Sequence, residues 1–373
     1  MSKLSTYLYK DKVFVIAAIF ALISFFVTPP SVSVLGAINY KVLIIMFTLM
    51  LAVMGLYETH FFDFVATKLV LLFQKTAWIT LVIVWTTFFL AMILTNDAVL
   101  LTLVPFAIFV MRHSNQEKHI VSLLILMTIA ANMGSALTPM GDPQNIYLYA
   151  FYQIPFRSFL GVMFPVTLMG FVLVTLFNFI LIPQTRSVLN ITAPSVTYHR
   201  IFVYIVLLIN GFLCVLHLIP EWITLGVTLL LGIFSSKHLF KRVDYPLLLT
   251  FVSFFIFTSN IGQSSSMMVL FSRFLNAPSR VYFSGLITSQ LISNVPAAVL
   301  LSTFTESTFS TPLLLGVNVG AMGSLIGSLA SLITFKYIIN EYGFLAKKYV
   351  IRYTLISLIF MVIMTFVIIF MLL

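Results

Sequence analysis

The stretch Ala131–Asn145 reads A-N-M-G-S-A-L-T-P-M-G-D-P-Q-N and interrupts a chain that is otherwise largely apolar. It follows a clean hydrophobic run, yet it holds two glycines, two prolines, two asparagines and an aspartate. A lipid-facing helix cannot hold such a segment, because the backbone groups that Gly and Pro release would find no water. Irregular backbone at membrane depth is tolerated where it lines a cavity or is buried in protein. The stretch therefore predicts a broken transmembrane helix at a binding site.

A second copy of this pattern lies further along the chain. Four positions recur at a constant offset of 186 residues: Asn132, Gly134, Thr138 and Gly141 match Asn318, Gly320, Ser324 and Gly327. Each copy is preceded by a polar tripeptide in apolar surroundings, Thr95-Asn96-Asp97 and Ser293-Asn294-Val295. Small polar residues in a single helix are usually packing positions. Interruptions at corresponding places in two halves instead indicate a transporter site.

Composition restricts the class of protein. Of the 373 residues, 61% are hydrophobic and 8% are charged, whereas a soluble domain is roughly 25% charged. The net charge of +10 comes from basic residues spread singly or in pairs between apolar runs, so we read them as topology signals rather than a nucleic-acid surface. No nucleophile–base set, metal-ligand spacing or phosphate-binding glycine loop is present in the sequence. We therefore expect a polytopic membrane protein that is not an enzyme and has no cofactor.

The apolar runs predict an all-α fold made of two repeats of inverted topology. Repeat 1 covers residues 12–182, with a re-entrant hairpin at 77–111 and a broken helix at 119–150. A connecting helix at 201–219 leads to repeat 2 at 222–373, with a hairpin at 279–305 and a broken helix at 312–340. Because the connector is a single helix, the second repeat begins on the opposite side of the membrane. Segments 61–74 and 262–276 suit helices that lie in the interface.

Lysine and arginine provide an independent test of this topology. With the N-terminus in the cytoplasm, 16 of the 20 basic residues fall on the inside, including Lys3, Lys10 and Lys12. The outside holds only Lys41, Arg157, Arg273 and Arg280. This asymmetry follows the positive-inside rule. We expect a multi-pass protein of the plasma membrane with a cytoplasmic N-terminus and an extracytoplasmic C-terminus.

Two of the ten acidic residues, Asp97 and Asp142, fall in the first tripeptide and the first helix break. The other eight, among them Asp244, fall in connections. An acid at membrane depth costs at least about 2.5–3.5 kcal/mol and is a functional candidate by default. Either could bind a proton, or stay ionised beside a cation. The alternative is a structural role, with Asp97 capping the second hairpin arm and Asp142 capping the helix after the break.

The amides of Asn96 and Asn294 offer oxygen ligands and N–H donors where two helix ends meet. Carbonyl oxygens freed at such a point can hold Na⁺, and helix N-termini can hold an anion. Neighbouring hydroxyls are available to either ligand: Thr95, Ser293, Ser135, Thr138 and Ser324. No Arg or Lys lies near these motifs in the sequence at membrane depth. An anionic substrate would therefore be neutralised by helix ends and by co-bound cations.

These motifs resemble those of the ion transporter superfamily, which includes arsenite permeases, NhaD-type antiporters, citrate transporters and divalent anion–sodium symporters. The resemblance rests on Thr95-Asn96-Asp97-Ala98, on 134–145 and on Ser293-Asn294-Val295-Pro296-Ala297, and the sequence is most similar to short bacterial anion permeases. It implies a homodimer that works by an elevator-type movement. The dicarboxylate branch has Ser-Asn-Thr at both tips, so Asp97 and Val295 are departures that favour proton coupling or a single cation site.

The resemblance also implies the site residues. The cation site and its inverted mate would be formed by Thr95, Asn96, Asp97, Asn132, Gly134, Ser293, Asn294, Asn318 and Gly320. The substrate would contact Asn96, Ser135, Thr138, Pro139, Gly141, Asp142, Asn145, Asn294, Val295, Pro296 and Ser324. No other metal site is expected.

The sequence thus predicts a secondary active transporter that moves a small, carboxylate-like anion or oxyanion coupled to Na⁺ or H⁺. Its partners would be that anion and the lipid bilayer, with no nucleic acid. Three alternatives remain open at this point: a Na⁺/H⁺ antiporter, an arsenite or antimonite efflux permease, and an ion channel.

Overall fold

The structure is a computed structural model that describes residues 12–26, 36–187, 189 and 191–372. Within these ranges the chain is helical, apart from turns and an isolated bridge between Lys75 and Arg186. Eight helical stretches in the described ranges are long and apolar enough to cross a membrane. The prediction of an all-α polytopic membrane protein is confirmed. Lys3 and Lys10, which the predicted topology places on the inside, lie outside the described residues.

The first half of the chain runs from α2 to α10, and α11 joins it to the second half. The helices of the first half are α2 (Lys12–Ser24), α4 (Tyr40–Glu58), α5 (Phe61–Val70), α6 (Thr76–Ala91), α7 (Asn96–His113), η1 (Glu117–His119), α8 (Ile120–Ser135), α9 (Pro143–Phe151) and α10 (Phe156–Leu181). The joining helix α11 is Tyr198–Val215. The hydrophobic run before Ala131–Asn145 thus ends as a helix at Ser135, and the Asp142–Pro143 pair begins the next helix.

The second half repeats this order of long, short and interrupted helices. Its elements are α12 (Glu221–Ser236), η2 (Lys237–Arg242), α13 (Tyr245–Gly262), α14 (Ser265–Phe274), α15 (Pro278–Ile292), α16 (Asn294–Ser302), η3 (Ser307–Phe309), α17 (Ser310–Val319), α18 (Leu329–Tyr342), η4 (Gly343–Leu345) and α19 (Ala346–Leu372). The helix interruption between α17 and α18 covers 320–328, the same place in the pattern as 136–142 in the first half.

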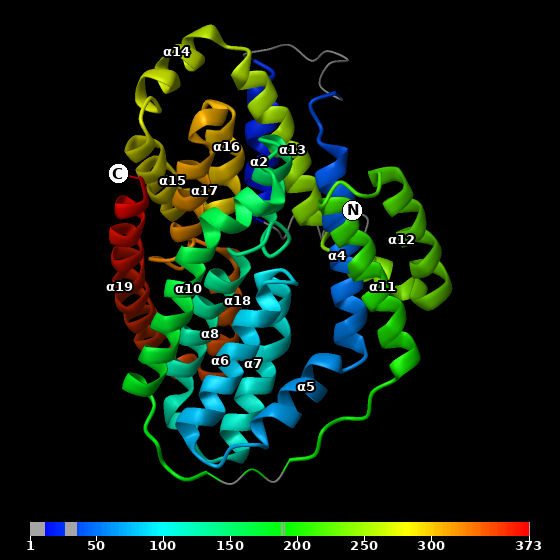
Figure 1. The fold of residues 1–373 in the computed structure, drawn as a ribbon, viewed down its shortest axis with the longest axis vertical. Helices are drawn as coiled ribbons and strands as arrows, with labels where there is room; N and C mark the ends of the chain where they lie inside the picture. The colour runs from blue at the N-terminus through cyan, green and yellow to red at the C-terminus, as the bar shows by residue number, and fades with distance from the viewer. Residues whose placement is uncertain (1–11, 27–35, 188, 190, 373) are drawn as a thin grey trace.

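The two hairpin units occupy opposite ends of the molecule. In Figure 1, α6, α7 and α8 fill the lower half, and α15, α16 and α17 fill the upper half. Each first arm packs on the broken helix that follows it, α6 on α8 and α15 on α17. Each second arm packs on the far half of the other broken helix, α7 on α18 and α16 on α9. The turns of the two hairpins therefore lie near mid-height, close to both helix interruptions.

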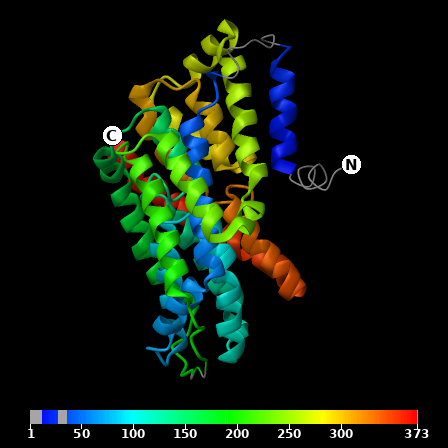
Figure 2. The same cartoon turned by 90° about the vertical axis from the view of Figure 1, so that its right-hand side faces the viewer.

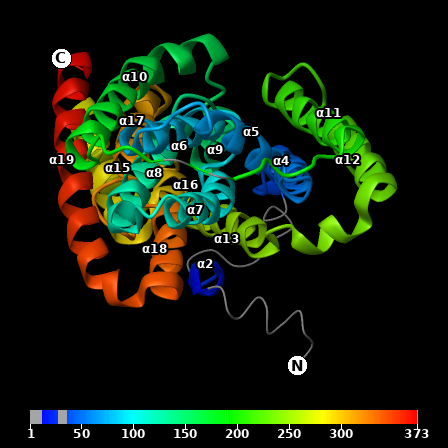
Figure 3. The same cartoon turned by 90° about the horizontal axis from the view of Figure 1, so that it is seen from below.

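Helices α4, α11 and α12 form a second group beside this bundle, as Figure 3 shows from below. Polar side chains tie the group together: Thr48 Oγ1 lies 2.9 Å from Thr228 Oγ1, and Asn210 Nδ2 donates to the Thr224 carbonyl at 3.1 Å. Hydrogen bonds of this kind between helices replace the hydrophobic driving force that lipid cannot supply. Within this group, α4 is the helix that faces the hairpin units. Its surface is therefore the one that lies beside the candidate site.

His217 lies in the turn between α11 and α12 and connects the two groups of helices. Its Nδ1 lies 2.6 Å from Lys41 Nζ, and its ring contacts the ring of Tyr149 on α9 at 5.8 Å. Burial, and then the charge of Lys41, lower the pKa of His217, and Glu221 opposes this effect. The neutral imidazole is therefore the form that fits this contact.

Because this contact fits a neutral imidazole, we expect the folded protein to lose stability in acid. An unfolded histidine has a pKa near 6.5, so below that pH the unfolded chain binds a proton that folded His217 resists. We expect the melting temperature to fall as the pH drops from about 6.5 through the lowered pKa. The His217→Asn variant accepts the Lys41 hydrogen bond and tolerates the residue's φ of 61°, and its melting temperature should fall less. Equal acid-side slopes of wild type and variant, measured by thermal unfolding in detergent, would contradict the assignment.

Candidate functional site

Asn96 begins α7 directly after the first hairpin turn, and its polar groups all point into the protein. Its backbone N–H donates to the Gly141 carbonyl at 3.1 Å, and its Oδ1 accepts from the Asp97 N–H at 2.8 Å. Its Nδ2 donates to Asn132 Oδ1 at 3.0 Å and to Asp142 Oδ2 at 2.8 Å. The side chain is 1% exposed. A single amide thus joins the first tip to both ends of the first helix interruption.

Asn294 holds the equivalent place at the second tip. Its backbone N–H donates to the Gly327 carbonyl at 3.0 Å, and its Oδ1 accepts from the Val295 N–H at 3.0 Å. Gly327 follows Gly141 by the same 186 residues that separate the two motifs. The preceding Ser293 has a φ of 75° and a ψ of 155°, a region that is essentially glycine's and costs on the order of 1–3 kcal/mol. Such strain is typical of functional segments.

Asp142 lies between the two tips. It occupies the cap position of α9, but its side chain makes no capping bond. Its Oδ2 instead accepts from Asn96 Nδ2 at 2.8 Å and from Asn294 Nδ2 at 3.4 Å. The capping alternative is therefore wrong for this residue. The residue is 3% exposed.

The charge of Asp142 has no basic partner. Among the described residues, no Lys, Arg or His forms an ion pair with its carboxylate. Moving an ionised carboxylate from water into the protein interior is unfavourable unless an opposite charge pairs with it. Without such a partner the carboxylate takes up a proton. The amides of Asn96 and Asn294, together with the side chains of Gln144 and Ser135, give part of the compensation, since hydrogen bonds to a charged group are worth about 1.5–3 kcal/mol each. The remainder can come from a proton or from a small cation.

Asn132 extends the network into the second half of the chain. Its Nδ2 donates to Ser328 Oγ at 3.2 Å and lies 3.5 Å from the Ala321 carbonyl. Ser328 is absent from the residues that the sequence predicts for the site. It follows Asp142 by 186 residues, so extending the repeat by a single position would have identified it. Unlike Asp142, Ser328 does cap its helix, accepting from the Ser331 N–H at 3.3 Å.

A second set of amides lies beside the first. Asn318 Nδ2 donates to Asn145 Oδ1 at 2.8 Å, and Asn145 Nδ2 donates to the Ser135 carbonyl at 3.2 Å. Gln144, which the sequence analysis also missed, donates weakly to Asn318 Oδ1 at 3.5 Å. The Gln144 side chain is fully buried, and its Oε1 has no hydrogen-bond partner. An orphaned acceptor of this kind marks a place where a ligand could bind.

The remaining residues predicted for the site are hydroxyls, closely packed glycines and buried residues beside the tips. Thr138 Oγ1 donates to the Met92 carbonyl, and Ser135 Oγ donates to the Asn132 carbonyl at 3.1 Å. The Ser324 Oγ is buried without a partner. Close packing explains the three glycines, because an added Cβ would lie 2.0 Å from Phe88 O at Gly134, 2.3 Å from Ser135 O at Gly141 and 2.7 Å from Ser289 Cβ at Gly320. Three others are buried beside the tips: Pro139, Val295 and Pro296.

The expected pairing of the two halves is only partly present. Asn96 does contact Asn132, but among the described residues no hydrogen bond links Asn294 to Asn318. Asn294 instead bonds to Asp142 of the first half, and Asn318 bonds to Asn145. The Asn96 side chain bonds within its own half, whereas the Asn294 side chain reaches Asp142 of the other half. The result is one joint network around Asp142 rather than two separate copies.

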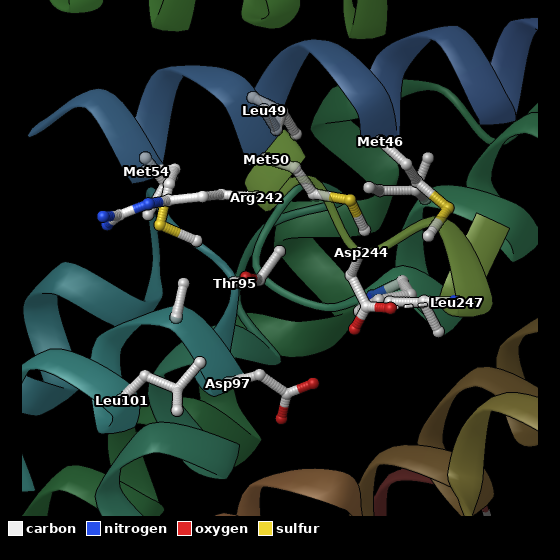
Figure 4. Close-up of a pocket in the computed structure, with 14 residues that line it drawn as sticks. Met46, Leu49, Met50, Met54, Thr95, Asp97, Leu101, Arg242, Asp244 and Leu247 are labelled. Atoms are coloured by element: carbon white, nitrogen blue, oxygen red, sulfur yellow. Dashed lines mark hydrogen bonds between the residues drawn. The ribbon is translucent and has the colours of Figure 1, made fainter. Parts of the chain in front are cut away.

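Asp97 does not join this network. Its side chain lines a neighbouring pocket of about 90 Å³ together with Thr95, and one carboxylate oxygen, Oδ1, is buried without a hydrogen-bond partner. Thr95, not Asp97, holds the cap position of α7. Figure 4 shows Asp97 and Asp244 turned toward the same space between α4 and the tip. Asp244 is therefore a second acidic residue of this pocket, although the sequence analysis placed it in a connection.

The wall opposite Asp97 belongs to α4. Met46, Met50 and Met54 lie one turn apart along that helix and line the pocket, as Figure 4 shows. Arg242 also lines it, so one basic side chain lies in the same pocket as Thr95 and Asp97. The Arg242 guanidinium is half-exposed and pairs with Glu58 at 3.0 Å. Arg242 and Asp244 lie where η2 leads into α13. No local sequence signal predicts that this segment approaches the first tip.

Comparison with known proteins identifies a family and two relatives. The family model described as a citrate transporter, CitMHS, matches residues 3–308. An uncharacterized transporter of Methanocaldococcus jannaschii is 30% identical over 304 residues, which cover 80% of this chain and 81% of that protein. The inner membrane protein YbiR of Escherichia coli (strain K12) is 29% identical over 325 residues, which cover 84% of each chain.

Proposed function

The chain belongs to the CitMHS citrate transporter family, a family of membrane transporters rather than enzymes, and from this we propose that it is a secondary active transporter of a small anion coupled to Na⁺ or H⁺. The observation that supports the coupling is Asp142, a buried carboxylate that accepts from the tip amides Asn96 and Asn294 and has no basic partner among the described residues. Such a group favours a proton or a cation as its companion.

The anion would bind between the two tips. Asn96 and Asn294 lie at the N-terminal ends of α7 and α16, where the positive end of the helix dipole favours negative charge. Ser324 Oγ is an orphaned hydroxyl that can donate to an anion, whereas Gln144 Oε1 is an orphaned acceptor that suits a cation or a donor group of the ligand. The cation at Asp142 would then supply the charge that the anion needs, which couples the two binding events.

The pocket beside the first tip supports a route by which ions reach the network. Thr95 and Asp97 face it, and the next residue, Asn96, belongs to the network. Its volume of about 90 Å³ is well below the roughly 300–1,000 Å³ of pockets that hold drug-sized molecules. This size favours a small ion. Citrate, which the family description names, would need a wider site than this conformation offers.

We propose alternating access of the elevator type for the movement. In this proposal the hairpins and broken helices move as a unit past α4 and α13, and the hairpins are re-entrant parts of two inverted repeats. Helix α16 has nine residues, about 13 Å at 1.5 Å per residue, which is less than half of a hydrocarbon core about 30 Å thick. The methionines of α4 suit a sliding surface, because their flexible side chains adapt to different neighbours.

We also propose a homodimer in the plasma membrane, with the N-terminus in the cytoplasm and the C-terminus outside. The balance of basic residues supports the orientation. A Na⁺/H⁺ antiporter is the second candidate function, because the Asp142 network offers a carboxylate and amides but no basic side chain for an anion.

Purified protein in liposomes tests these functions. We expect uptake of a small labelled carboxylate or oxyanion, driven by an inward Na⁺ or H⁺ gradient, and saturable with counter-exchange. Binding should also raise thermal stability, by about 2.7 kcal/mol when the ligand is at a hundredfold excess over its Kd. Na⁺-driven proton movement without any anion would replace the proposal by the antiporter. Non-saturating flux would indicate a channel, and metalloid resistance on expression would indicate arsenite efflux.

A further inference from the structure

A second pocket lies against the other hairpin tip, between α2, α13, α15 and the start of α18. Its volume is about 410 Å³, within the range of small-molecule sites. Hydrocarbon side chains form nearly all of its wall, including Phe20 of α2 and Phe254 of α13. The one polar side chain among its lining residues is Ser293, at the strained second tip.

This pocket corresponds to the one beside Asp97. Thr95 and Ser293 are the equivalent tip residues, and both pockets include the residues one and four places after the helix interruption: Pro143 and Ile146 in one, Leu329 and Leu332 in the other. The chemistry differs, because the first pocket contains Asp97, Asp244 and Arg242 and the second contains no charged side chain. A hydrated ion is stable only in the first. The second suits a hydrocarbon ligand.

The apolar pocket is continuous with the surface that faces lipid. Four of its wall residues are strongly exposed on this chain: Ile16 (52%), Phe20 (45%), Leu291 (71%) and Ile326 (53%). Figure 2 shows α2 on the outer side of α13. Two contacts fasten it there, the Phe20–Phe257 ring contact at 5.7 Å and a hydrogen bond from Asn260 Nδ2 to Ser24 Oγ at 2.9 Å. An opening between membrane helices gives access from the bilayer rather than from water.

We propose that one acyl chain of a membrane lipid occupies this pocket and contacts the second tip from the side. An empty apolar cavity forfeits dispersion contacts with its walls, and water does not fill it because it finds no polar partners there. Lipid chains are the apolar molecules present at high concentration where the pocket opens. The bound chain completes the packing around Ser293 without contacting the Asp142 network.

Quenching of a tryptophan by lipids with brominated acyl chains tests this. The natural tryptophans, Trp78, Trp85 and Trp222, are first replaced by Phe, and one tryptophan is then introduced at a time. Phe254 lines the pocket and is 7% exposed, so Phe254→Trp should be quenched as strongly as the exposed Ile16→Trp. Phe251, one turn earlier on α13, is fully buried and does not line the pocket. Phe251→Trp should therefore stay unquenched.

Equal, weak quenching of Phe254→Trp and Phe251→Trp would overturn the proposal. So would quenching of Phe254→Trp by a bromoalkanoate added from water but not by the brominated lipid, which would assign the pocket to the apolar part of a soluble ligand. If Phe254→Trp does not fold, Phe257→Trp provides the same measurement. Filling the pocket with Leu332→Trp should lower the amount of lipid retained by the natural protein in native mass spectrometry, and unchanged retention would contradict the proposal.

Discussion

Replacing Asp142 by asparagine is expected to abolish cation-driven transport while the protein still folds. Asparagine keeps the shape of the side chain, and its carbonyl oxygen can accept the same bonds from Asn96 and Asn294. It loses the negative charge that would hold a proton or Na⁺. Since charged hydrogen bonds and ion contacts are worth about 1.5–3 kcal/mol each, we expect apparent cation affinity to fall by at least about 100-fold.

Folding should survive this change because the native carboxylate is buried without a basic partner. Removing a poorly compensated buried charge is often neutral or stabilising, so the melting temperature without Na⁺ should be unchanged or higher. The measurements are uptake into liposomes and the Na⁺-dependent rise in melting temperature, which should disappear. Asp63→Asn, at an exposed position beside His60 on α5, is the control and should behave as wild type. A variant at Asp142 that keeps its Na⁺ response would place the cation elsewhere.

Replacing Gly134 by alanine is expected to have the largest effect on stability. An added Cβ would lie 2.0 Å from the Phe88 carbonyl oxygen and 2.8 Å from its carbonyl carbon. Both atoms belong to the backbone of α6, so no side chain can turn away, and α6 and α8 must separate. Overpacking of a buried site typically costs about 1–3 kcal/mol and occasionally more. We expect about 3 kcal/mol or more here, because the obstructing atoms are backbone.

The control for Gly134→Ala is the same substitution at Gly161 in α10. Nothing lies within 4 Å of a Cβ added there, and alanine is better than glycine in a helix by about 0.5–1 kcal/mol. Thermal unfolding in detergent should therefore show a large fall in melting temperature for Gly134→Ala and no fall for Gly161→Ala. Similar melting temperatures would mean that α6 and α8 do not approach each other as closely as the structure describes.

The Gly134 contact also shows how much a sequence repeat can predict. The pairs Asn132/Asn318 and Gly134/Gly320 identified both helix interruptions, and the structure has them at 136–142 and 320–328. The tip residues Asn96 and Asn294 were found by the same reasoning, and both lie in the network. Family membership was predicted from the same motifs and is confirmed by the citrate transporter model that matches residues 3–308.

The different surroundings of the two acids were not predictable from the sequence. Asp97 and Asp142 both follow a polar segment and both lie at the start of a helix, so local pattern gives each a site role and a capping role. Only the folded chain shows that Asp142 accepts bonds from both tips while Asp97 faces the α4 pocket with Asp244. Arg242 was missed because its neighbours in the pocket are distant in the sequence, whereas Ser328 could have been found by extending the 186-residue repeat by one position.

The sequence alone determined that this chain is a helical membrane protein and where its helices break. These properties follow from local forces: apolar runs partition into lipid, and Gly, Pro and Asn free backbone groups that need partners. Only the tertiary structure decided which side chains share the hydrogen-bonded network, and that the side chain of Asp142 rather than that of Asp97 accepts bonds from both tips. The direction of a side chain at a helix end is set by the neighbours across the bundle, and the two halves bring those neighbours together only when they pack.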